Sequence, residues 1–162
     1  MANTQAMCTS FLGELMTATH NFTTGTGNTF KAALFLATAN TSSSTTLCAS
    51  VTAYATTVNT IAEVSGTNYV AGGVTITNGT SPASTNSSTT AGVGYWTPSA
   101  SITYTNVTLT TPFDTVLIYN SSASDKAVSV HTFGSQTVTA GTFTLTMPAN
   151  TTSTALLRLA TT

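Results

Sequence analysis

The stretch TVLIYNSSASDKAVSVHTFG, residues 115–134, decides the fold. Its first part, Thr115–Tyr119, is a continuous apolar run, which predicts a β-strand covered on both faces. Further along, Val128 and Val130 alternate with polar neighbours, as in a strand with one buried face. Between the two lies the small polar segment Asn120–Lys126, a composition typical of a hairpin loop. The stretch therefore predicts two antiparallel strands joined by a short loop.

Further strands are predicted on both sides of this hairpin. Apolar residues alternate with polar ones in several short runs, at a spacing of about 8–14 residues that is typical of sandwiches and jelly rolls. These runs are Phe30–Leu36, Val74–Ile76, Ile102–Leu109, Phe143–Met147 and Ala155–Leu159. Between Tyr104 and Val107 the apolar parity flips, so we expect a bulge or strand break at Asn106. Gly72 and Gly73 precede Val74 and predict a turn or bulge with positive φ.

The fold class predicted from this pattern is all-β, a jelly-roll-like β-sandwich with a short N-terminal helix. A chain of 162 residues has the length of a single domain. We assign residues 1–22 to the helix and an arm, and residues 23–162 to the sandwich. Two segments rich in serine and threonine, Thr38–Thr46 and Asn78–Gly94, are predicted to be exposed loops within this domain.

The N-terminal helix is predicted over Met7–Met16. Six apolar residues fall there at spacings of three and four: Met7, Cys8, Phe11, Leu12, Leu15 and Met16. Asn3 or Thr4 is the expected N-cap. The helix is expected to dock on its own sheet, and the alternative is an arm that reaches a neighbouring subunit.

Charge is the most unusual property of the composition. Charged residues make up 4% of the chain, against about 25% in a typical soluble domain. The seven are Glu14, Lys31, Glu63, Asp114, Asp125, Lys126 and Arg158. Three scattered cations cannot neutralise a run of phosphates, so we expect no nucleic-acid partner. A surface of hydroxyls and amides, without mutual charge repulsion, suits a protein packed beside copies of itself or on a large assembly.

The sequence also shows no signal for secretion or for membrane insertion. The opening residues 1–16 lack the basic and long apolar regions of a signal peptide. No apolar run approaches the roughly 18 residues of a membrane span, so we predict no membrane association. Cys8 and Cys48 could pair, but without a secretion signal they are expected to be reduced.

No catalytic or metal site is predicted. His20 and His131 show no ligand spacing with the two cysteines, so neither a metal nor a cofactor is expected. A set of serine, His131 and Asp114 can be drawn, but the abundance of serines makes the choice of nucleophile arbitrary. We expect His131 to be hydrogen-bonded or solvent-facing. The four acids fall on different predicted elements, which argues against a glycosidase pair. The chain is therefore predicted not to be an enzyme.

Several segments resemble small structural proteins of tailed bacteriophages. The clearest is EVSGTNYVAGGVTITN, residues 63–78. The others follow in the family's order: CTSFLGEL (8–15), HNF (20–22), TFKAALF (29–35), LIYN (117–120), DKAVSVHTFG (125–134), GTFTLTMP (141–148) and ALLRLA (155–160). The resemblance implies a virion protein, a head decoration or cement protein with a jelly-roll-like sandwich. The chain departs from the family's pattern at Leu47–Ile61 and at Pro112–Asp114.

The resemblance also implies the partner and the location. The partner would be the major capsid protein, the location the phage head, and the chain a homo-oligomer, with a trimer suited to three-fold positions. Candidate contact residues are Met7, Phe11, Leu15, Tyr95 and Trp96, because aromatic anchors carry much interface energy. Core packing is the equal alternative for Trp96. The alternative functions are a neck, tail or fibre module and, more remotely, a carbohydrate-active β-sandwich enzyme.

Overall fold

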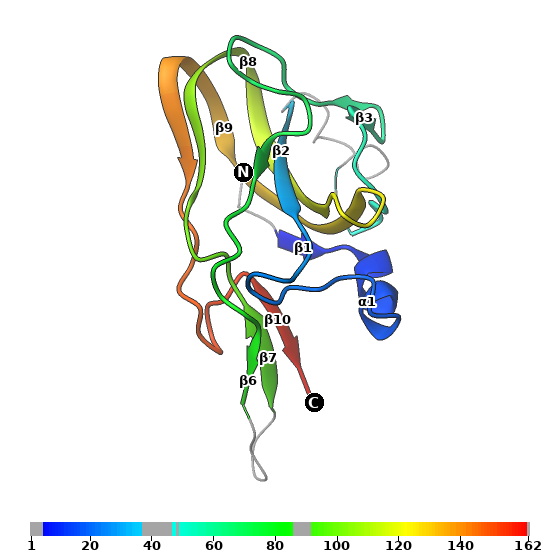
Figure 1. Cartoon of the computed structure of the whole chain (residues 1–162). Helices are drawn as coiled ribbons and strands as arrows, with labels where there is room; N and C mark the ends of the chain where they lie inside the picture. Colours follow the sequence, from blue (N-terminus) through cyan, green and yellow to red (C-terminus); the bar gives the residue numbers. More distant parts are fainter. Residues whose placement is uncertain (1–4, 37–46, 48, 86–91, 162) are drawn as a thin grey trace.

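The computed structural model describes residues 5–36, 47, 49–85 and 92–161 (Figure 1). It is an all-β protein with one short helix among these residues. The elements are β1 (Gln5–Met7), α1 (Thr9–Met16), β2 (Phe30–Leu36), β3 (Thr57–Val58), β4 (Ile61–Ala62), β5 (Val74–Thr75), β6 (Ala83–Ser84), β7 (Val93–Trp96), β8 (Ile102–Asn120), β9 (Lys126–Leu145) and β10 (Leu157–Ala160).

The strands form unequal antiparallel sheets. The large sheet has five strands in the order β1-β9-β8-β2-β5, and the small sheet has three in the order β10-β7-β6. Strands β3 and β4 pair with each other. In Figure 1 the small sheet extends below the large one, and α1 lies to one side of both. The predicted all-β sandwich with a short N-terminal helix is confirmed.

The β8–β9 hairpin is the scaffold of the molecule. Its strands of 19 and 20 residues rise, curve over and return (Figure 1). Register shifts interrupt the ladder between Tyr104 and Val107, and again around Phe113. Because of the curvature, the ring of Phe143 lies 5.0 Å from that of Phe113 and 5.4 Å from that of Phe133. The open end of the hairpin thus packs against its own middle.

The bulge predicted at Asn106 is confirmed, since the register shifts there and Asn106 has a φ of 53°. The predicted strand break is not found, because β8 continues through this point. The loop over Asn120–Lys126 is also confirmed: β8 ends at Asn120 and β9 begins at Lys126. Gly72 and Gly73 have φ values of 91° and 69°, as the predicted turn requires.

The central part of β8 is buried on both faces, as its apolar run predicts. Every residue from Phe113 to Asn120 is buried. One face packs near the returning ends of the hairpin, since Val116 and Ile118 share a cavity with Ile102. The other face is covered by the segment before β3, where the ring of Tyr54 stacks on Tyr119 at 4.4 Å. The core therefore lies on both sides of β2 and β8.

Two predicted boundaries are wrong. The helix begins at Thr9, because Met7 belongs to β1 and pairs with Ser129. Its N-cap is Cys8, whose side chain makes no capping hydrogen bond; Asn3 and Thr4 lie outside the described residues. The segment Asn78–Gly94, predicted as a loop, contains β6 and the start of β7. Here the ladder between the two strands, rather than apolar alternation, holds the backbone extended.

Three other predictions concern the ends and loops. Helix α1 docks on its own chain, since Phe11 is buried with its ring 4.9 Å from that of His20. The predicted loop Thr38–Thr46 and the pairing partner Cys48 lie outside the described residues. Among the described residues, no helix is long and apolar enough to cross a membrane.

Candidate interaction groove

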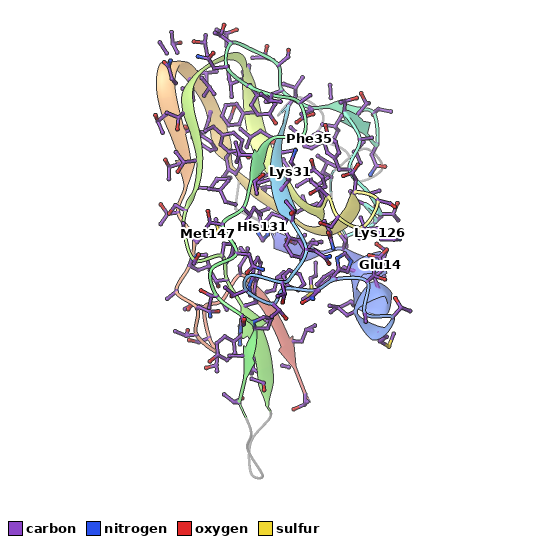
Figure 2. The ribbon with its side chains drawn as sticks, viewed as in Figure 1. Glu14, Lys31, Phe35, Lys126, His131 and Met147 are labelled. Carbon is purple, nitrogen blue, oxygen red and sulfur yellow. The ribbon has the colours of Figure 1, made fainter. Side chains whose placement is uncertain are left out.

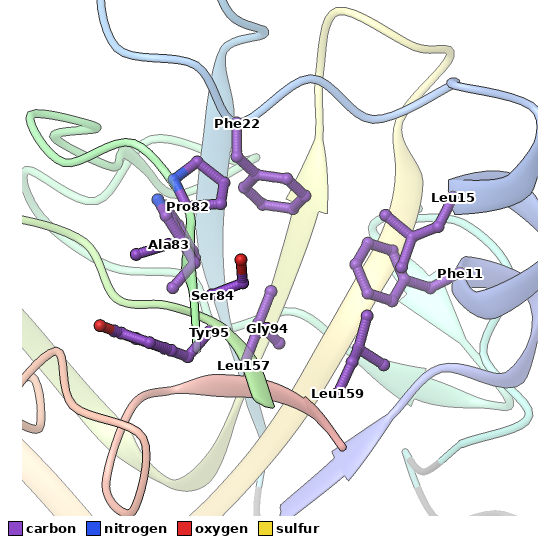
Figure 3. Close-up of a pocket in the computed structure, with 11 residues that line it drawn as sticks. Phe11, Leu15, Phe22, Pro82, Ala83, Ser84, Gly94, Tyr95, Leu157 and Leu159 are labelled. Atoms are coloured by element: carbon purple, nitrogen blue, oxygen red, sulfur yellow. The ribbon is translucent and has the colours of Figure 1, made fainter. Parts of the chain in front are cut away.

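An apolar groove separates α1 from the small sheet (Figure 3). Its volume is about 340 Å³. Phe11 and Leu15 form the helix wall, and Leu157 and Leu159 of β10 form the strand wall. Among the described residues, none of those that line it is charged. A groove of this composition is suited to apolar side chains.

Strand parity explains the wall formed by the small sheet. Leu157 and Leu159 are two residues apart and therefore lie on one face of β10. On that face Leu157 pairs with Trp96, and Leu159 pairs with Gly94. A Cβ added at Gly94 would meet nothing closer than 3.9 Å, at the carbonyl oxygen of Leu159. The absent side chain of Gly94 therefore leaves part of the groove open.

The back of the groove is an aromatic cluster. Phe22 stacks on Phe30 with ring centroids 4.3 Å apart, and the Trp96 ring lies 4.7 Å from Phe22. The indole Nε1 of Trp96 donates hydrogen bonds to Asn78 Oδ1 at 3.1 Å and to the Thr80 carbonyl at 2.9 Å. Buried tryptophans usually satisfy their N–H in this way. Trp96 is thus a core residue that also faces the groove.

The helix wall is held in place by a polar network around Glu14 (Figure 2). Its carboxylate accepts hydrogen bonds from Lys126 Nζ at 2.7 Å and from His20 Nε2 at 2.8 Å. The other ring nitrogen of the buried His20 lies 3.1 Å from the amide of Asn120. Burial raises the pKa of Glu14, but the hydrogen bonds from Lys126 and His20 outweigh it, so the pKa lies below the ordinary 4.5. The network joins α1 to the turn of the long hairpin.

The groove gathers most of the contact residues predicted from the sequence. Phe11, Leu15, Tyr95 and Trp96 all line it. Phe11 and Trp96 are each only 2% exposed, so of the two alternatives left open for Trp96 the structure agrees with core packing. The fifth residue, Met7, lines a different cavity beside His131, because it belongs to β1.

The side of the groove formed by β10 carries no signal in the sequence. The alternating pattern predicts the strand that contains Leu157 and Leu159, but not which of its two faces borders a groove. Among the described residues, four large hydrophobic side chains are exposed: Met16 (85%), Val70 (73%), Leu159 (44%) and Leu12 (43%). Leu159 lines the groove, and Leu12 and Met16 belong to the helix that forms its wall. Three of these four residues thus belong to the two elements, α1 and β10, that form the walls of the groove.

A second polar cluster surrounds Glu63, at the start of the segment 63–78. The buried carboxylate of Glu63 accepts hydrogen bonds from Tyr54 Oη at 2.6 Å, Tyr69 Oη at 2.7 Å and the Gly72 N–H at 2.8 Å. Tyr69 Oη in turn accepts one from the Leu34 N–H at 2.9 Å. Burial and the neighbouring carboxylate raise the pKa of Tyr54 and of Tyr69 above the ordinary value. The cluster fastens the glycine turn to β2 through three hydrogen bonds to the buried Glu63.

One serine–histidine contact occurs on β9. Ser129 Oγ lies 2.9 Å from His131 Nε2, so His131 is hydrogen-bonded, as predicted. Burial lowers the pKa of His131 to about 4, which keeps the ring neutral at physiological pH. Ser129 is itself buried. The pair borders the same cavity as Met7.

The acids do not gather in the groove. Glu63 is bound by its own loop, and the buried Asp114 accepts a hydrogen bond from the Thr115 hydroxyl at 2.7 Å. Over residues 5–36, 47, 49–85 and 92–161, no group of three or more His, Cys, Asp or Glu residues is placed to hold a metal ion.

We compared the chain with known protein families, curated proteins and solved structures. We found no match to a protein-family model, to a curated protein or to a solved structure. The function has to be inferred from the residues of this chain.

Proposed function

We propose that this chain is a structural virion protein, a decoration protein that binds the assembled head of a tailed phage and stabilises it by non-covalent contacts. The resemblance of segments from Cys8 to Ala160, in order, to small phage structural proteins supports this assignment. The partner would be the major capsid protein, and no catalytic step is involved.

The observation that carries the proposal is the near absence of surface charge. All seven charged residues lie within the described ranges. Arg158 is exposed, and Glu14, Lys31, Asp125 and Lys126 are partly exposed. Glu63 and Asp114 are buried, and Glu14 and Lys126 pair with each other. Burying an unpaired charge in an interface is costly. A surface with so few charges avoids this cost over most of its area.

The mechanism is thermodynamic linkage. A protein that binds the assembled shell and not the separated subunits stabilises the shell by mass action. An interface of about 1,600 Å² is the standard size for specific association. Here the contacts would come from apolar burial and from hydrogen bonds of hydroxyl and backbone groups.

The test is to measure copy number and salt sensitivity on purified particles. Quantitative mass spectrometry should find the protein in many copies, in fixed proportion to the major capsid protein. Washing with moderate salt should leave it attached, because hydroxyl and apolar contacts are barely screened. A few copies per particle would instead indicate a neck, tail or fibre station. Release by salt alone would contradict the proposed mode of binding.

A further inference from the structure

We propose that the groove between α1 and the small sheet is occupied by a second copy of this chain, in a two-fold dimer. In this dimer Met16 of each copy, with Leu12 beside it, enters the groove of the other. The inference does not depend on the virion assignment, because it concerns the isolated chain.

The first support is that α1 carries a protruding apolar side chain, Met16, and also forms one wall of the apolar groove. Phe11 and Leu15 of α1 face the groove. Leu12 and Met16 follow them by one residue each, so they form the neighbouring stripe of the same helix. Met16 is 85% exposed. In a two-fold interface each residue contact occurs twice, so the protrusion and its cavity must lie in one patch. This patch meets that condition.

The second support is the match in chemistry. The groove has an apolar lining without charge, and its open part lies at Gly94 and Leu159. Methionine is unbranched and flexible, which suits an irregular cavity. Copies of the chain also repel one another little, because the formal net charge is −1 over 162 residues. A partner rich in charge would gain nothing from this lining, whereas a second copy supplies leucine and methionine.

The third support is the distribution of exposed apolar groups. Leu159 lines the groove, and Leu12 and Met16 belong to the helix that forms its wall. One two-fold contact that includes this helix and the groove would cover all three. The remaining exposed residue, Val70, lines a separate cavity with Tyr104 and Val107. Val70 is therefore a natural control for the effect of a charge placed on an exposed apolar residue.

The experiment uses the full chain in sedimentation equilibrium across a dilution series. Wild type should sediment as a dimer. Met16→Glu places a charge in the apolar groove and should raise the dimer dissociation constant by more than about tenfold, a factor that corresponds to about 1.4 kcal/mol. Val70→Glu should leave the constant unchanged. Circular dichroism and a thermal melt would show that both variants fold.

A variant on the other side of the contact tests the cavity itself. Gly94→Phe fills the groove without adding charge and should also weaken the dimer, whereas Gly94→Ala leaves most of the groove open and should not. Mixing Met16→Glu with Gly94→Phe should restore association in part. The mixed dimer keeps one intact contact, between the Met16 of the second variant and the groove of the first.

Three results would overturn the proposal. They are a wild-type chain that stays monomeric at all concentrations, a trimer in which mixing the two variants restores nothing, and a dimer that neither variant weakens. A small apolar molecule found in the groove by native mass spectrometry, together with a monomeric mass, would assign the groove to a ligand.

Discussion

Glu14 of α1 and Lys126 of β9 are 112 positions apart in the sequence, and their side chains meet at 2.7 Å. The contact joins the helix to the first residue after the hairpin turn. Because α1 forms one wall of the groove, this ion pair helps to hold that wall against the rest of the chain.

Glu14→Gln should lower the free energy of unfolding by about 1 kcal/mol or less, since Lys126 is partly exposed and water screens the pair. The pKa of Glu14 in the folded protein lies below 4.5, so its contribution is present above pH 4.5 and is lost as the pH falls through the folded pKa. Urea unfolding at several pH values would measure this. A double-mutant cycle with Lys126→Met should give a coupling energy at neutral pH and none in acid. An unchanged coupling in acid would contradict the assignment.

Glu63→Gln should lower the free energy of unfolding by more, about 2–3 kcal/mol. The carboxylate accepts three hydrogen bonds, two of them from tyrosine hydroxyls. In glutamine only the amide oxygen accepts, so the hydroxyl that faces the NH2 group would have to turn from donor to acceptor, and the charge that strengthens all three bonds would be lost. Urea unfolding should show this loss as a lower midpoint. Asp125→Asn, at the hairpin turn, is the matched control and should change stability by less than about 0.5 kcal/mol. Equal effects of the two variants would show that the Glu63 cluster is not a stabilising element.

Substitution by alanine at Gly73 and at Gly13 should change the stability of the protein in opposite directions. A Cβ at Gly73 would overlap the carbonyl oxygen of Ala32, and its φ of 69° is strained for alanine, so Gly73→Ala should prevent folding or destabilise strongly. A Cβ at Gly13 meets nothing within 4 Å on the helix. Gly13→Ala should therefore stabilise by about 0.5–1 kcal/mol. Thermal melts of both variants would test the pair, and a well-folded Gly73→Ala would contradict the close packing of this turn on β2.

Stability should rise with pH between about 4 and the ordinary histidine value of 6.5, because burial lowers the pKa of His131 to about 4. In this window the unfolded chain binds a proton at this position that the folded chain does not, so acid favours unfolding. His131→Asn should flatten the curve. The midpoint of urea unfolding, measured from pH 4 to pH 7, would report it, and parallel curves for the two proteins would assign the slope to another group.

The parts of the fold that depend on local pattern could be predicted from the sequence. Alternation and turn composition located the hairpin through Asn120–Lys126, and a change of parity located the bulge at Asn106. Strand β6 could not be predicted, because Ala83–Ser84 has no apolar pattern and is extended only through its pairing with β7. The curvature that brings Phe143 onto Phe113 depends on contacts far apart in sequence, which no local pattern encodes.

The candidate groove was predicted in part for a similar reason. Residue type alone singled out Phe11, Leu15, Tyr95 and Trp96, since large apolar side chains have to be placed in a core or an interface. It could not tell which of these two roles each has. That decision depends on what covers the side chain: hydrogen bonds of its indole and the Phe22 ring hold Trp96 in the core.

The long β8–β9 hairpin also has a consequence for how the chain acquires its structure. Closing one short turn brings two long strands into register, and the loss of loop-closure entropy at that step is small. Hairpins of this kind form in about 1–10 μs. The slower step is then the meeting of Phe113 with Phe143, which requires the paired ribbon to bend across itself. Nucleation at the turn, followed by zippering and collapse, is the order of events that this topology favours.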